Sequence, residues 1–195
     1  IVDMTGEGIT SARKEVELSI ERIFTHAAWA DKFDGATHSA PIRGLALAMN
    51  EPVGTIGIIC SDDFPLLGLV SAIAPALAMG NTCVVIPSEP YPLSATDFYQ
   101  VFDTSDIPAG VINLVTAKHD EIVEAISGHM DLDALWYFGS SGLTATVEKL
   151  SATNLKRTWV NHGKFRNWTD SSQAEGKEFL RQSTEIKNIW IPYGE

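Results

Sequence analysis

The stretch from Pro52 to Glu89 constrains the fold of this chain more than any other part of the sequence. Thr55 to Cys60 is short, rich in isoleucine and without polar alternation, which predicts a strand covered on both faces. The apolar segment from Leu66 to Met79 is long enough for a helix and too short to span a bilayer. Thr82 to Ile86 reads as a second covered strand. The stretch therefore predicts a βαβ unit, whose strands are parallel because a crossover helix joins them.

The same alternation continues after this unit. Strands are expected at Gly110–Val115, Leu135–Phe138 and Lys156–Val160, and helices at Leu93–Phe102, His119–Ile126 and Ser141–Leu150. Strands that alternate with helices at this spacing predict an α/β fold with a doubly wound parallel sheet.

An amphipathic helix from about Thr10 to Lys32 is expected ahead of the βαβ unit. Its apolar residues step by three and four, and we expect their face to pack on the core: Ile9, Ala12, Val16, Ile20, Ile23, Phe24 and Ala27. Ala40 to Asn50 reads as an extended segment that leads into the first strand.

The last part of the chain changes character at Gly163. A polar, irregular connector follows, with a helical turn expected at Lys177–Arg181. Ser183 to Pro192 then alternates, with Ile186, Asn188 and Trp190 on one face, which predicts a strand. Such a strand cannot stand alone in water, so we expect it to join a sheet edge within this chain or on a partner.

Composition narrows the possible partners and compartments. Lys and Arg number 14 against 25 Asp and Glu, a net charge of −11 that argues against nucleic acid or an anionic membrane as partner. Cys60 and Cys83 both lie in predicted buried strands, so neither is expected to be a nucleophile. The sequence has no signal peptide or spanning segment, and we expect a cytoplasmic protein. Because the first residue is Ile1 rather than methionine, a piece of a longer polypeptide is expected.

Four short motifs carry a family resemblance. They are Trp29-Ala-Asp-Lys, Glu51-Pro-Val-Gly, Ile107-Pro-Ala-Gly-Val-Ile-Asn-Leu-Val and Asp131-Leu-Asp-Ala-Leu-Trp-Tyr-Phe-Gly-Ser-Ser. In this order they resemble the Rossmann-like cofactor domain of the NAD(P)-dependent aldehyde dehydrogenase superfamily. The terminal strand resembles the oligomerisation strand of that superfamily. The resemblance implies three parts: a cofactor-domain fold over 1–162, a connector over 163–182 and an oligomerisation-type strand over 183–195.

The residues that resemble the catalytic positions of the family do not match its chemistry. The family's catalytic domain normally lies between the cofactor domain and the terminal strand, where this chain has about twenty residues and a domain needs on the order of a hundred. Asp63 stands where the family has the asparagine that holds the oxyanion, and an ionised carboxylate can only accept hydrogen bonds. Val160 or Asn161 stands at the catalytic glutamate. We therefore expect no catalytic residue in this chain.

The cofactor positions are only partly kept. Ile86 replaces the lysine that reaches the adenosine ribose, while Glu89 persists. Gly139 and Ser140 match the glycine and serine that meet the pyrophosphate, although a tight turn and a helix cap (by Ser140 or Ser141) are the simplest roles for them. We expect weak remnants of a cofactor site at Gly139, Ser140 and Glu89, no cofactor in this chain, and NAD in a longer parent enzyme.

Other site hypotheses are weaker. The five histidines show no metal-ligand spacing, so no metal site is expected. Asp62-Asp63 reads either as a carboxylate pair for metal or acid–base work or, in preference, as a solvated turn that caps the following helix.

Three functions stay open: a non-catalytic domain for structure and assembly, an NAD-binding or regulatory module, and an active enzyme. The missing nucleophile disfavours the third. The ending resembles the degenerate C-terminal copy in the family-sixteen aldehyde dehydrogenases, which implies a parent that oxidises aldehydes with NAD. The expected partner is the catalytic domain of that parent or a second subunit, reached by β-strand addition through Thr184–Ile191, with a homodimeric parent.

Overall fold

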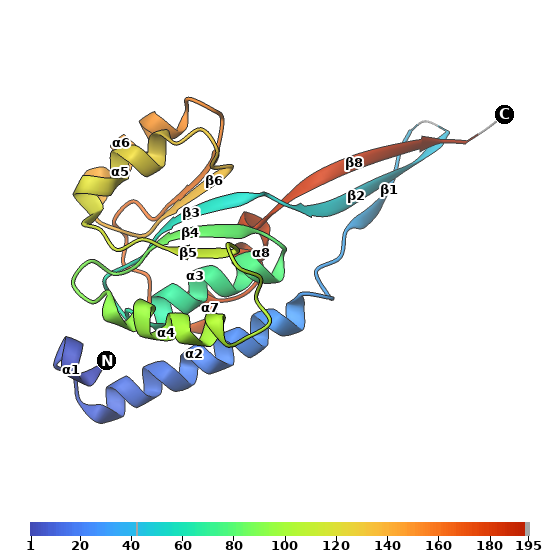
Figure 1. Ribbon diagram of the computed structural model, residues 1–195. Helices are drawn as coiled ribbons and strands as arrows, with labels where there is room; N and C mark the ends of the chain where they lie inside the picture. Colours follow the sequence, from blue (N-terminus) through green and yellow to red (C-terminus); the bar gives the residue numbers. More distant parts are fainter. Residues whose placement is uncertain (42, 194–195) are drawn as a thin grey trace.

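A five-stranded parallel sheet forms the centre of the molecule. The computed structural model describes residues 1–41 and 43–193. The strands stand in the order β5-β4-β3-β6-β7 (Figure 1). Their bounds are β3 Thr55–Ile59, β4 Thr82–Ile86, β5 Ile112–Leu114, β6 Ala134–Tyr137 and β7 Arg157–Val160. Every neighbouring pair is parallel, so the predicted α/β doubly wound fold is confirmed.

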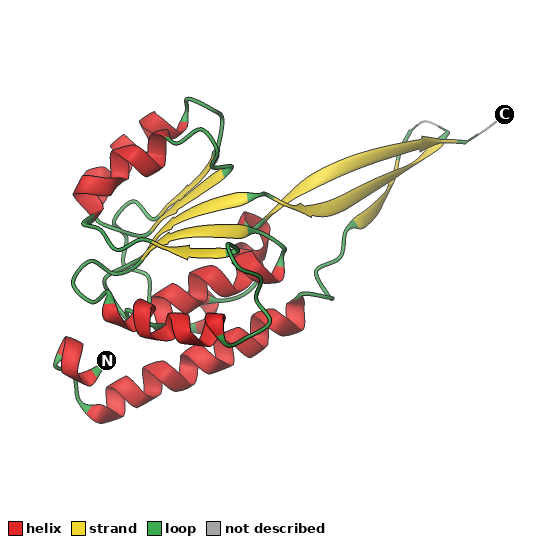
Figure 2. Cartoon of the chain, in the orientation of Figure 1, coloured by secondary structure: helices red, strands yellow, loops and turns green. Residues whose placement is uncertain are grey.

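Helices cover both faces of this sheet (Figure 2). α3 (Leu67–Ala78) and α4 (Leu93–Asp103) lie on one face, and α5 (His119–Gly128) and α6 (Thr144–Ser151) lie on the other. A short 3-10 turn, η1 (Ser141–Leu143), leads into α6. The long helix α2 (Ile9–Trp29) packs on the outer side of α3, after the short α1 (Val2–Thr5). No helix among the described residues is both long and apolar enough to cross a membrane.

The segment from 163 to 182 takes part in the core. It contains α7 (Ser171–Ala174) and α8 (Lys177–Gln182), and it buries Trp168 and Phe179 to 1% and 0% exposure. Phe179 meets Trp136 and Trp159 of the sheet edge-on, with ring centroids 6.3 and 4.9 Å apart. Edge-to-face pairs of this kind contribute about 0.5–1.5 kcal/mol each beyond the area that they bury. The segment is therefore held to the sheet by aromatic packing.

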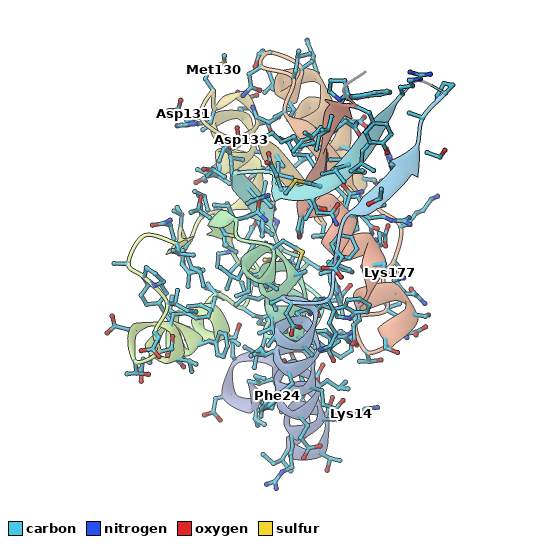
Figure 3. The ribbon with its side chains drawn as sticks, turned by 90° about the vertical axis from the view of Figure 1, so that its right-hand side faces the viewer. Lys14, Phe24, Met130, Asp131, Asp133 and Lys177 are labelled. Atoms are coloured by element: carbon cyan, nitrogen blue, oxygen red, sulfur yellow. The ribbon has the colours of Figure 1, made fainter. Side chains whose placement is uncertain are left out.

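α2 is rotated about its own axis relative to the sequence prediction, so that a neighbouring face is buried. Its apolar residues Ile9, Val16, Ile20, Ile23 and Phe24 are exposed, and its buried residues are Ala12, Glu15, Ser19, Arg22 and His26. Phe24, labelled in Figure 3, is 73% exposed. The prediction that the apolar face packs on the core is correct for Ala12 and otherwise wrong, because the neighbouring, more polar face finds charged and backbone partners inside.

A second, three-stranded antiparallel sheet extends from the body (Figure 1). It consists of β1 (Ala36–Ser39), β2 (Gly44–Pro52) and β8 (Thr184–Pro192), in the order β1-β2-β8. β8 pairs with β2 over its whole length, from Thr184 opposite Pro52 to Pro192 opposite Gly44. Of the two possibilities that the sequence left open for the terminal strand, this pairing is the one within the chain. The sequence analysis did not predict β1, since Ala36–Ser39 is short and all four of its residues are exposed.

Candidate functional site at the switch point of the sheet

The strand order reverses between β3 and β6, and the loops after these two strands meet there. Ser61, Asp62 and Asp63 follow β3, and Gly139 and Ser140 follow β6. In open parallel sheets, ligands bind outside the carboxyl ends of the strands at such a switch point. A ligand site is therefore expected at this edge of the sheet.

Two depressions open at this edge. The smaller one, of about 310 Å³, runs from Asp62 and Asp63 across Ser140 to Asn161 and Arg166. The larger one, of about 630 Å³, is lined by Asp62, Glu89, Pro90, Lys118, His119, Asp120, Ser140 and Leu143. Asp62 and Ser140 border both, so the predicted cofactor remnants and the aspartate pair come together in one region.

Gly139 is required by a close approach of Tyr137. A Cβ atom on Gly139 would lie 2.6 Å from the Tyr137 hydroxyl oxygen, which donates to the Ser140 carbonyl oxygen at 2.8 Å. Ser140 stands at the start of η1, and its side chain makes no capping hydrogen bond there, nor does a side chain cap the first turn of α6. The predicted helix cap by Ser140 or Ser141 is not formed, and the tyrosine holds the turn instead.

The carboxylates of Asp62 and Glu89 hold neighbouring loops together. Asp62 Oδ1 accepts hydrogen bonds from Ser88 Oγ at 3.2 Å and from the Glu89 backbone N–H at 2.9 Å. Glu89 Oε2 in turn accepts from the His119 backbone N–H at 2.8 Å, at the first turn of α5, where a negative charge is favourable. Asp62 therefore does not cap α3, contrary to the preferred sequence interpretation of the aspartate pair.

The cap of α3 comes from a residue far away in the sequence. Glu15 Oε1 accepts from the backbone N–H groups of Leu66 and Leu67 at 2.8 and 3.1 Å. Glu15 is 3% exposed, although the apolar periodicity of α2 does not predict that this residue is buried. Sequence reasoning missed this contact because the two partners are 51 residues apart.

The residues around the larger depression do not fit a dinucleotide well. Three carboxylates, those of Asp62, Glu89 and Asp120, line the wall where a pyrophosphate would need donors, against one ammonium group, that of Lys118. Like charges at close range are unfavourable in a partly desolvated site. Ile86, in the place of the ribose-binding lysine, is 1% exposed and has no side-chain donor.

At the positions that resemble catalytic residues, the backbone of Asp63 and the side chain of Asn161 make local contacts. The Asp63 backbone N–H donates to Ser61 Oγ at 3.2 Å, and Asn161 Nδ2 donates to the Lys164 carbonyl oxygen. Val160 is aliphatic and cannot activate water. Asn161 and Val160 therefore give no general base at this edge.

The thiols of both cysteines are buried in the core. Cys60 and Cys83 are 1% and 0% exposed. Burial raises the pKa of the Cys60 thiol, helped by the nearby Asp62 charge, and burial raises the pKa of Cys83 to about 12. Because the thiolate is the nucleophilic form, neither cysteine is a nucleophile at neutral pH. Among the described residues, no group of three His, Cys, Asp or Glu side chains is arranged to hold a metal ion.

Arg166 is a feature of this edge that sequence reasoning missed. Its guanidinium carbon lies 5.1–6.0 Å from the ring centroids of Phe138, Trp159, Trp168 and Phe179. Its Nη1 is 3.3 Å from Glu178 Oε2. Cation–π contacts stabilise such an arrangement. The signal available in the sequence was the pair of aromatic residues, Phe165 and Trp168, on either side of Arg166 in an otherwise polar segment.

The doubly wound sheet and its switch-point depressions define an α/β domain of the dinucleotide-binding class. The particular family follows from comparison: the chain belongs to the aldehyde dehydrogenase family, whose model matches residues 1–165. An aldehyde dehydrogenase-like protein of Schizosaccharomyces pombe is 35% identical over 190 residues, which cover 97% of this chain and 36% of that protein. An aldehyde dehydrogenase of Agaricus bisporus is 37% identical over 150 residues, covering 76% of this chain and 30% of that enzyme.

Solved structures agree with this assignment. Betaine aldehyde dehydrogenase from Staphylococcus aureus, in complex with NAD+, superimposes with a TM-score of 0.75 at 28% identity. The match covers 82% of this chain and 32% of that enzyme. The chain therefore spans about a third of the length of the relatives that it matches.

Proposed function

We propose that this chain is a non-catalytic aldehyde dehydrogenase domain that serves structure and assembly. The observation that carries the proposal is the state of its thiols, because aldehyde oxidation in this family, as the resemblance implies, begins with a cysteine thiolate. Cys60 and Cys83 are both buried, and burial raises the pKa of each. Asp63 and Val160 or Asn161, at the oxyanion and general-base positions, support the same conclusion.

The connection between β7 and β8 also supports it. The chain leaves β7 at Val160 and enters β8 at Thr184, and the residues between them pack Trp168 and Phe179 into the core. A segment of this length, already used for packing, leaves no room for a catalytic domain, which needs on the order of a hundred residues.

The longer parent protein would carry the chemistry. The relatives of this chain include aldehyde dehydrogenases, and one related structure contains NAD+. We propose that the parent oxidises aldehydes to carboxylic acids with NAD in the cytoplasm. This domain would be the degenerate copy, like that of the family-sixteen enzymes, and would pack against the catalytic domain or a second subunit in a homodimer.

The three-stranded sheet is the proposed means of assembly. It extends away from the body (Figure 1), and β8 lies at its edge. Exposed sheet edges add strands from partners, because unpaired N–H and C=O groups at the edge are ready to bond. Ile186 and Trp190, 64% and 59% exposed, add apolar surface next to this edge.

Residual NAD binding is the second candidate function. The observation in its favour is the Ser140 side chain, which caps no helix and borders both depressions. Calorimetric titration with NAD or NADH separates the two candidates. We expect no binding tighter than about 1 mM, and micromolar binding would favour the regulatory module instead.

Two further measurements test the main proposal. The first is NADH production with a panel of aldehydes, where we expect no turnover by this chain alone; turnover would contradict it. The second is light scattering after size exclusion, on the full chain and on a chain shortened after Ser183. If the shortened chain matches the full chain in both association and solubility, the assembly role is wrong.

A further inference from the structure

The connector over 163–182 places a guanidinium group inside a box of aromatic rings. The guanidinium carbon of Arg166 lies 5.1–6.0 Å from the centroids of four rings, which together form the aromatic box: Phe138, Trp159, Trp168 and Phe179. The rings pack edge to face on one another, with Phe138 5.1 Å from Trp159 and 5.3 Å from Trp168. Each of the four residues is at most 8% exposed. The box is therefore a desolvated site, in which cation–π attraction is stronger than at the surface.

Two oxygen atoms at the box suit a guanidinium group in particular. Arg166 Nη1 donates to the Gln173 carbonyl oxygen and lies 3.3 Å from Glu178 Oε2. Both oxygens accept from N–H groups, which a guanidinium ion offers and a quaternary ammonium ion lacks. The rings therefore recognise the charge and the planar shape, and the oxygens recognise the N–H donors.

Arg166 satisfies this site incompletely. Its Nε is buried and, among the described residues, has no hydrogen-bond partner. A buried donor without a partner is unfavourable. The side chain is still 13% exposed, and it lines the smaller depression at the switch point, of about 310 Å³, together with Phe138 and Trp168. The aromatic box therefore adjoins that depression, and Arg166 borders both.

We propose that the aromatic box is a binding site for the guanidinium group of a small molecule, and that Arg166 is an internal ligand that closes it. The small molecule reaches the box from the depression when Arg166 moves out. Asp62 and Asp63 line that depression, and among the described residues around it Lys164 is then the one remaining cation. The two carboxylates favour a cationic ligand. The proposed assembly function does not use this edge of the sheet, so the two proposals stand or fall separately.

The walls of the box are held independently of Arg166. Arg22 Nη2, on α2, donates to the Trp168 carbonyl oxygen at 3.1 Å. Trp159 belongs to β7 and Phe179 to α8. The rings therefore stay in place when Arg166 leaves, and the vacated space keeps the shape of a guanidinium group.

A tight turn provides the point at which the segment with Arg166 moves. His162 and Gly163 have left-handed φ angles of 51° and 65°. A Cβ atom on Gly163 would collide with Ser141, which follows β6. The closed position of Arg166 thus depends on a glycine at this turn, and a larger residue there favours the open position.

Removal of the internal ligand tests the site directly. Arg166→Ala leaves the box empty, and methylguanidinium, the probe, is expected to bind with a dissociation constant on the order of 1 mM. The readouts are tryptophan fluorescence, since two box residues are Trp159 and Trp168, and a rise in Tm that saturates with the probe. Sodium chloride holds the ionic strength constant. Arg166→Ala without saturable binding would overturn the site.

Two further probes test its specificity. N-methylurea has nearly the shape of methylguanidinium but no charge, so we expect it to bind to Arg166→Ala at least about 10-fold more weakly. Tetramethylammonium has the charge but no N–H group, and we expect weaker binding because the oxygens of Gln173 and Glu178 gain no donor. Equal binding of N-methylurea would overturn cation recognition. Equal binding of tetramethylammonium would overturn the assignment to guanidinium compounds.

The wild-type chain tests whether Arg166 is displaced. Its apparent affinity is reduced by the fraction of molecules in which the box is open. With a few per cent open, we expect methylguanidinium to bind about 30-fold more weakly than to Arg166→Ala. Equal affinity of the two chains would show that the probe binds elsewhere and would overturn the proposal.

Gly163→Ala tests the same displacement in a chain that keeps Arg166, and it decides the matter if Arg166→Ala does not fold. A side chain at residue 163 strains the closed turn, so we expect methylguanidinium to bind about 5-fold more tightly than to the wild type. Gly110→Ala is the matched control, because Gly110 also has a left-handed φ, of 84°, in a loop between α4 and β5. It should bind like the wild type. Unchanged affinity of Gly163→Ala would overturn the role of Arg166 as an internal ligand.

Discussion

Asn81 Nδ2 donates a hydrogen bond to the carbonyl oxygen of Ser183 at 2.8 Å, 102 residues further along the chain. The same amide group donates to Ala76 at the end of α3, and its Oδ1 accepts from the Gly54 N–H at 2.9 Å. One side chain, 2% exposed, thus joins the end of α3, the start of β3 and the residue from which β8 begins. The extended sheet is anchored to the body through this amide.

The first prediction replaces that amide with its isosteric acid. Asn81→Asp keeps the acceptor for Gly54 but loses both donors and places a carboxylate against two buried carbonyl oxygens. We expect a loss of about 3 kcal/mol or more in the free energy of unfolding, measured by urea denaturation. Hydrogen exchange of β8 should increase as well. Asn188→Asp, on an exposed residue, is the control, and equal losses in both variants would contradict the anchoring role.

The second prediction concerns the cap of α3. Glu15→Ala leaves the N–H groups of Leu66 and Leu67 buried without their acceptor, so we expect a loss of about 2–4 kcal/mol in unfolding free energy. Glu15→Gln keeps one acceptor oxygen and should lose only about 1 kcal/mol. Exposed Glu17→Ala is the control and should change stability by less than about 0.5 kcal/mol. A Glu15→Ala variant as stable as that control would exclude the cap.

The central sheet could be predicted from the sequence, whereas the packing of α2 could not. β4 has the predicted bounds, because covered parallel strands are continuous apolar runs with clear ends. The helical period of α2 was also correct, and only the direction of burial failed. The apolar periodicity of a helix indicates that its faces differ in polarity. Which face is buried depends on contact partners such as Leu66, Trp168 and Glu175, which are distant in sequence. For the same reason the sequence does not predict the packing of Arg166 against its four aromatic rings.

The rotated orientation of α2 gives the third prediction. Phe24→Lys replaces an apolar residue that is 73% exposed, so we expect a change of less than about 0.5 kcal/mol in unfolding free energy. Arg22→Ala should lose about 3–5 kcal/mol, because Arg22 is 2% exposed and is paired with Glu175 at 2.5 Å. Ordinary amphipathic packing requires the opposite order of effects. Thermal or urea unfolding of the two variants under identical conditions therefore decides between the two orientations.

The last prediction is a loss of stability in mild acid caused by His26. This side chain is fully buried, and its Nδ1 lies 3.0 Å from the Arg22 carbonyl oxygen, to which the neutral ring donates. Among the described residues its Nε2 has no partner, so a proton added there would be buried without an acceptor. Burial accordingly lowers the pKa of His26, against the smaller opposing effects of the Arg22 carbonyl and the Glu175 charge.

The sign of the effect follows from that direction. The unfolded chain binds a proton at His26 near pH 6.5, whereas the folded chain does so only at lower pH, so the contribution of His26 to stability is present above pH 6.5. It decreases as the pH falls, by at most about 1.4 kcal/mol per pH unit until the folded pKa is reached. Urea denaturation between pH 7.5 and 5 should show this slope in the wild type, and His26→Gln should reduce it. Exposed His38→Gln is the control, and a slope that survives in His26→Gln would assign the acid sensitivity to other groups.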